Sequence, residues 1–151
     1  MRKILFCLFF LYCLIVSMIL LFGRGACADI SVKEYFLLYA NILPFETLIR
    51  YSLFFIRQRD FYSFLLAFFN IGGNFLLFLP MGFFLPALFW RMRTMTNCFF
   101  VIFFAVFSAE ILQGIFRVGV PDIDDLIVNL FGAYIGFLIS KKLCFCRQAL
   151  S

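Results

Sequence analysis

The chain of 151 residues is 66% hydrophobic and only 14% charged, and it contains 26 phenylalanines and a formal net charge of +5. A soluble domain is typically about 45–50% apolar and about 25% charged, so this composition excludes a water-soluble globular fold and indicates an integral membrane protein. The positive charge does not indicate nucleic-acid binding, because the basic residues lie in short groups beside apolar runs, as they do at the ends of membrane spans.

Residues 4–22 form the first apolar run, which contains no charge and is long enough for a membrane span of about 20 residues. It follows two bases and precedes an Ala-Cys-Ala sequence at 26–28 that is similar to a signal-peptidase site. A cleaved signal peptide is therefore the alternative to a retained helix. The apolar region of a signal peptide is normally only about 7–15 residues, so the length of this run favours retention.

Residues 23–62 are predicted to form an extracellular segment at the membrane interface. Charges recur every few positions and Pro44 interrupts the segment, so it is too polar to span a bilayer and too apolar to lie free in water. One or two amphipathic helices lying in the interface fit this composition. Asn41 and the Pro-Phe-Glu sequence at 44–46 predict a turn followed by such a helix, and a lid over the polar cluster described below is an alternative role.

Three more spans are predicted at 63–90, 97–116 and 122–140, and residues 141–151 form a cytoplasmic tail. The span at 63–90 is interrupted by Asn70, Gly72, Gly73, Asn74 and Pro80. We expect Pro80 to kink the helix, because neighbouring groups in a bundle can satisfy the carbonyl that it releases. A gating hinge or a wall of a site is the alternative role.

The charges predict the orientation. If the N-terminus is cytoplasmic, the inner flanks hold seven bases and no acid, whereas the outer segments hold six bases and seven acids. Bases in short loops near helix ends favour the cytoplasmic side, so both termini are predicted to lie in the bacterial cytoplasm. The expected fold is a single all-α domain of four transmembrane helices, with an interfacial loop or helix between the first two.

Residues 110–129, EILQGIFRVGVPDIDDLIVN, place five charged side chains between two apolar spans. Glu110, Gln113 and Arg117 have the spacing i, i+3, i+7 and therefore share one face of a helix. A charged group at membrane depth costs several kcal/mol, by contested scales, so these side chains must be paired, protonated or exposed to water.

The same spacing recurs after a turn. Gly119 and Pro121 are turn formers, and Asp122, Asp125 and Asn129 then repeat the interval i, i+3, i+7 on a helix running the opposite way. Neither polar stripe tolerates lipid, so we expect the two stripes to face each other, with Arg117 as counter-charge for an Asp of the following helix. An Asp at the start of a helix also caps exposed N–H groups. Three Asp residues at one helix start are more than a cap needs, so we expect a further role for them.

Small residues continue the fourth predicted span. Gly132, Gly136 and Ser140 recur every four residues, and this small-xxx-small pattern lets a neighbouring helix approach closely.

Three blocks of the sequence resemble the VanZ-like family of small bacterial membrane proteins: NILPFET at 41–47, NIGGNFLLFLPMGFFLP at 70–86, and EILQGIFRVGVPDIDDLIVNLFGAYIG at 110–136. The resemblance covers nearly the whole chain after the first helix. It implies a four-helix protein of the cytoplasmic membrane and a link to low-level resistance to teicoplanin, a glycopeptide that binds cell-wall precursors. It implies no particular reaction.

The predicted ligands are a lipid-linked cell-wall precursor, another lipid or the glycopeptide itself. Arg117 would bind a phosphate or carboxylate, and the Asp residues would bind amines or sugar hydroxyls. The candidate binding residues are Asn74, Glu110, Gln113, Arg117, Asp122, Asp124, Asp125 and Asn129.

Other readings of the cluster stay open. One alternative is a structural clasp that fixes helix register in an accessory membrane subunit. Another is the site of an intramembrane hydrolase or transferase, with Glu110 and Asp125 as weak catalytic candidates, because two close carboxylates split their pKa values. A transporter subunit has little support without inverted repeats.

No cofactor is predicted, although oxygen ligands from the acids would suit Mg²⁺ or Mn²⁺. The six cysteines form no Cys-x-x-Cys pair, and the chain has no histidine, so zinc and haem sites are poorly supported. We interpret the cysteines as small apolar side chains. They are Cys7, Cys13, Cys27, Cys98, Cys144 and Cys146.

Overall fold

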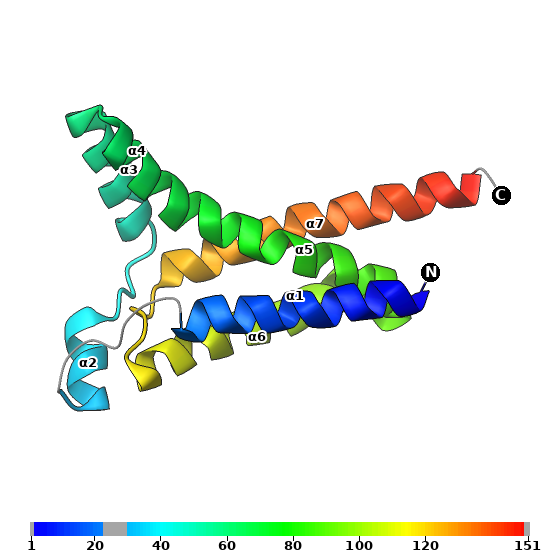
Figure 1. The fold of residues 1–151 in the computed structure, drawn as a ribbon, viewed down its shortest axis with the longest axis horizontal. Helices are drawn as coiled ribbons and strands as arrows, with labels where there is room; N and C mark the ends of the chain where they lie inside the picture. The colour runs from blue at the N-terminus through cyan, green and yellow to red at the C-terminus, as the bar shows by residue number, and fades with distance from the viewer. Residues whose placement is uncertain (1, 23–29, 150–151) are drawn as a thin grey trace.

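The computed structural model describes residues 2–22 and 30–149, and side chains at 21–22 and 144–149 are not part of this description. The Ala-Cys-Ala sequence at 26–28, including Cys27, and the side chains of Cys144 and Cys146 therefore lie outside the described part. The described elements are, in chain order, α1 (Arg2–Phe22), α2 (Val32–Tyr39), α3 (Glu46–Gln58), α4 (Phe61–Ala67), the π-helix η1 (Phe68–Gly72), α5 (Gly73–Leu88), the 3₁₀-helix η2 (Trp90–Arg93), α6 (Met95–Phe116) and α7 (Ile123–Ala149) (Figure 1).

Four helical stretches of the described chain are long and apolar enough to cross a membrane, which confirms the predicted all-α membrane fold. They are Arg2–Leu20, Phe61–Leu88, Met95–Phe116 and Ile123–Leu143, and the second joins α4, η1 and α5 into one continuous helix. The start of α1 and the end of α7 lie at one end of the bundle, whereas α2 and the turn between α6 and α7 lie at the other (Figure 1). The chain is therefore a multi-pass membrane protein, and its orientation stays a prediction.

The segment between the first two spans contains two helices, as predicted. α2 begins in a capping box, in which the N–H of Glu34 donates to Ser31 Oγ and a Glu34 carboxylate oxygen accepts from the Ser31 N–H and hydroxyl. Hydrogen bonds from the Ser31 hydroxyl and then its N–H lower the pKa of Glu34. α3 begins differently: its N-cap is Phe45, which has a left-handed backbone (φ 69°) and no side-chain acceptor.

The π-helix lies at the sequence position where polar residues and glycines interrupt the second span. A π-helix widens the turn by one residue and is common at functional sites. Asn70 lies within it, and its Nδ2 donates to the carbonyl oxygen of Leu66 at 2.8 Å. Pro80 and Pro86 both lie inside α5, which remains one helix from Gly73 to Leu88.

The closest packing in the bundle joins α5 to α7 through glycines. A Cβ atom on Gly132 would lie 2.1 Å from the carbonyl oxygen of Phe75, and one on Gly136 would lie 2.0 Å from that of Leu79. Gly82 makes an equally close approach from the α5 side. The predicted role of the small-xxx-small pattern is thus confirmed, and its partner is the second span. Helix backbones in contact gain van der Waals packing, which drives association in lipid.

The buried core lies between α5, α6 and α7, and α1 packs on its outside through Phe9, Val16 and Leu20. The hydroxyl of Tyr12 on α1 also donates to the carbonyl oxygen of Leu77, at 2.6 Å. Cys98 is fully buried in the core, in agreement with its reading as an apolar side chain. Core residues are Phe78, Leu85, Cys98, Ile102, Val106, Ala133 and Phe137.

We expect Gly136→Ala to destabilise the protein by more than the ~1–3 kcal/mol that overpacking commonly costs, because the obstacle is backbone rather than a movable side chain. The measurement is thermal unfolding of the purified protein in detergent, followed by circular dichroism. Gly73→Ala is the matched control, since a Cβ there meets nothing within 4 Å. Alanine is also the better helix former by about 1 kcal/mol. Equal melting of the two variants would contradict the close α5–α7 contact.

Candidate polar binding site

The site begins where the loop after α2 meets the start of α7. The N–H of Asn41 donates to the carbonyl oxygen of Pro121 at 2.9 Å, and the N–H of Ile123 donates to the carbonyl oxygen of Asn41 at 3.0 Å. Asn41 and Asp122 thus form an isolated parallel bridge. This short backbone pairing attaches the interfacial segment to the end of the bundle.

Asp122 is the centre of a network of hydrogen bonds. Its Oδ1 accepts from Asn41 Nδ2 at 3.2 Å and from the N–H of Asp124 at 2.8 Å, and its Oδ2 accepts from the Thr47 hydroxyl at 2.6 Å. The N–H of Asp122 in turn donates to Glu110 Oε2 at 3.1 Å. Asp122 and Glu110 are both buried. Burial of a carboxylate is costly unless donors replace water, and here three donors reach Asp122.

Asp124 supplies the N-terminal cap that α3 lacks. Its carboxylate is 1% exposed, and it accepts the N–H of Phe45 at 2.5 Å and the N–H of Leu48 at 3.1 Å. These are the N-cap and N3 positions of α3, so a residue of α7 does what a local Ser or Asp normally does. The negative charge also complements the positive end of the α3 dipole.

A polar pocket of about 180 Å³ lies beside this network. It is bounded by α2, the following loop, α3, η1, the turn before α7 and the first turn of α7. Its lining combines one base, two acids, two phenols, two amides and a hydroxyl, together with one valine. The lining residues are Tyr39, Asn41, Thr47, Arg50, Tyr51, Asn70, Val120, Asp122 and Asp125.

Two of the predicted binding residues, Asp122 and Asp125, line this pocket. The polar side chains on α6 contact different parts of the protein. Glu110 is directed at the start of α7, whereas Gln113 Nε2 donates to the carbonyl oxygen of Leu20 on α1, at 2.8 Å. Gln113 therefore binds the helix that packs on the other side of α6.

Arg117 lies at the end of α6, where helical spacing stops applying. It is the C-cap of α6 and has a left-handed backbone (φ 55°), so the i, i+7 relation to Glu110 no longer fixes its direction. Its Nη1 donates to the carbonyl oxygen of Ile30 at 2.6 Å, which ties the end of α6 to the start of the interfacial segment. Arg117 is not among the residues that line the pocket.

Asn74 and Asn129 also lie outside the pocket lining. Asn129 is 2% exposed, and its Oδ1 has no hydrogen-bond partner within the described parts of the chain. It precedes Gly132 by about one turn on α7. Asn74 is half-buried at the start of α5.

The lining residues that the sequence did not single out come mainly from α3 and η1. Thr47, Arg50 and Tyr51 are spaced i, i+3, i+4, which places them on one face of α3 and would have been a usable signal. Asn70 interrupts a predicted span, and the hydrophobic pattern does not reveal that it lies in a π-helix.

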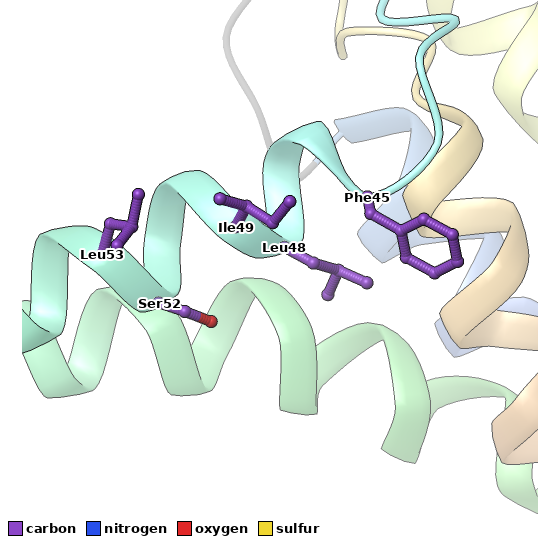
Figure 2. A pocket seen from close by; sticks show the side chains of 5 residues that line it. All are labelled: Phe45, Leu48, Ile49, Ser52 and Leu53. Atoms are coloured by element: carbon purple, nitrogen blue, oxygen red, sulfur yellow. The ribbon is translucent and has the colours of Figure 1, made fainter.

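The opposite side of α3 is apolar. Phe45, Leu48, Ile49, Ser52 and Leu53 border an open hollow of about 550 Å³, and Figure 2 shows these side chains along one side of the helix. α3 therefore turns its polar face to the pocket and an apolar face away from it, as an interfacial helix does.

The acids do not assemble into a cluster suited to a metal. In the described ranges, no group of three or more His, Cys, Asp and Glu side chains could hold an ion. The carboxylates of Asp122 and Asp124 instead accept N–H and O–H donors.

A family model described as VanZ/LLP1 matches residues 8–145, which is nearly the whole chain. Comparisons with curated proteins and with solved structures find no match.

We expect Asp124→Ala to release the start of α3 and to destabilise the protein by about 0.5–2 kcal/mol, because the first turn of α3 loses its capping acceptor. Hydrogen exchange should then quicken at the amides of Phe45 and Leu48. Asp60→Ala is the matched control: Asp60 caps α4 locally through the Ser63 N–H, so exchange should quicken there and not in α3. Unchanged exchange at Leu48 in Asp124→Ala would refute the capping role.

Proposed function

Because the chain belongs to the VanZ/LLP1 family, we propose that it lowers bacterial susceptibility to teicoplanin-type glycopeptides by binding a polar ligand at the membrane surface. The observation that carries this proposal is the pocket between α2, α3, η1 and α7. The predicted ligand classes are a cell-wall precursor, a lipid or the drug, and each bears hydroxyl, amine or acidic groups.

The pocket chemistry supports such a ligand. Asp125 and Asp122 offer carboxylate oxygens to hydroxyls and amines, and the amides of Asn41 and Asn70 add both donors and acceptors. A site with both signs of charge recognises a ligand that carries acceptors and donors together.

Arg50 takes the role that the sequence suggested for Arg117. It lines the pocket, and its guanidinium is held by an exposed ion pair with Glu46 at 2.9 Å. Such surface pairs are worth only about 0–1 kcal/mol, so a phosphate or carboxylate of a ligand can replace Glu46. Guanidinium groups match both anions in two-point geometry.

The geometry favours binding over catalysis. Glu110 lies outside the pocket lining and accepts a backbone N–H, so the cavity surface offers Asp125 without Glu110 beside it. General acid–base chemistry needs both groups within hydrogen-bond reach of the substrate.

We expect Asp125→Asn and Arg50→Gln each to reduce the teicoplanin concentration that cells survive to that of cells without the protein. Each change removes a charge from the pocket while keeping a side chain of similar size. Arg57→Gln is the matched control, because Arg57 lies on the same helix but does not line the pocket.

The measurement is a susceptibility assay beside quantification of each variant in the membrane fraction. Full protection by both pocket variants at normal abundance would refute the role of the pocket.

A further inference from the structure

The depth of the pocket follows from the lengths of the spans. At the end of the bundle that holds the start of α1, the residue types that typically lie at a membrane boundary are Lys3, Trp90 and Lys141. The hydrocarbon layer is about 30 Å thick, or about 20 helical residues at about 1.5 Å each. Counting about 20 residues from these markers toward the other end reaches positions near 23, 70 and 121. This count places Asn70 and Asp122 near the opposite boundary between hydrocarbon and head groups.

Large apolar side chains are exposed at positions next in sequence to three of the lining residues. Ile42, beside Asn41, is 77% exposed, and Phe69, beside Asn70, is 65% exposed. Leu38, beside Tyr39, is 71% exposed. Large apolar side chains on several neighbouring elements are unfavourable in water and favourable in a leaflet, so the sides of the pocket face lipid.

The size of the pocket restricts its occupant. A volume of about 180 Å³ is below the ~300–1,000 Å³ of sites that enclose drug-sized ligands. The pocket therefore accommodates a small polar head and not a whole glycopeptide.

The charges of the lining indicate the chemistry of the head group that the pocket binds. Arg50 is the base of the lining and suits a phosphate, whereas Asp122 and Asp125 are acceptors for hydroxyl donors. Tyr39, Tyr51 and Thr47 add neutral hydroxyls. A phosphate ester with a hydroxylated head group suits this lining, because the phosphate can bind Arg50 and the hydroxyls can donate to the carboxylates.

We propose that the pocket binds a phospholipid whose phosphate carries a hydroxylated head, of which phosphatidylglycerol is the simplest. The lipid enters sideways from the leaflet opposite the termini. Its phosphate lies beside Arg50, its head-group hydroxyls donate to Asp125 and Asp122, and its chains stay in the bilayer beside Ile42 and Phe69. This inference rests on the proposed function, because it names the ligand of the same pocket.

The test uses thermal unfolding of the full-length protein in an uncharged detergent. The probes are dioctanoyl-phosphatidylglycerol, dioctanoyl-phosphatidylcholine, glycerol phosphate and teicoplanin. We expect the phosphatidylglycerol alone to raise the melting temperature, because the choline lipid lacks hydroxyls and glycerol phosphate lacks chains. Arg50→Gln and Asp125→Asn should each weaken the apparent affinity at least about tenfold, and Arg57→Gln should leave it unchanged.

Each other result has a defined meaning. An equal shift with phosphatidylcholine, or with glycerol phosphate, would overturn the lipid-head assignment, as would no shift with phosphatidylglycerol. Stabilisation by teicoplanin alone, lost in the pocket variants, would overturn it while supporting the proposed function. Pocket-dependent binding of phosphatidylglycerol in variants that still protect cells fully would support the lipid site and refute the proposed function.

Discussion

The attachment of the interfacial segment to α7 depends on two buried carboxylates. Asp122 binds the loop through Asn41 and Thr47, and Asp124 caps α3 from the side. Neither carboxylate could be buried without donors, and the first amides of α3 need an acceptor because the N-cap Phe45 offers none. The interfacial segment therefore supplies donors to the two carboxylates, and the carboxylates supply acceptors to that segment. These hydrogen bonds hold α3 over the end of the bundle, and the polar pocket exists because of them.

The glycine contact between α5 and α7 positions the side of the pocket that η1 forms. Close backbone approach at Gly132 and Gly136 fixes α5, and with it the continuous helix that carries η1. The wider π turn then places Asn70 in the pocket lining together with Asp125. The pocket therefore requires two contacts: the apolar glycine contact between α5 and α7, deep in the bundle, and the hydrogen bonds between α3 and α7 near its end.

The sequence predicts those features that depend on local pattern. Span length and hydropathy identify four spans, and the spacing of Gly132, Gly136 and Ser140 identifies a helix contact. The cap of α3 by Asp124 is a tertiary contact with no local pattern, so it was not predicted. The hydrogen bond from Arg117 to the carbonyl oxygen of Ile30 is likewise a contact between distant parts of the chain, which helical spacing does not predict. Arg50 lies in a segment whose local pattern does not indicate which of its faces meets the start of α7.

The cap on α3 also constrains the order of biosynthesis. Asp124 follows Phe45 and Leu48 by 79 and 76 residues. Chains fold as they leave the ribosome, N-terminal parts first. The first amides of α3 must therefore rely on water or lipid head groups until the last span has been translated. The pocket consequently cannot form before the start of α7 has been synthesised, and a truncated translation product that ends before residue 124 lacks the cap that holds α3 in place.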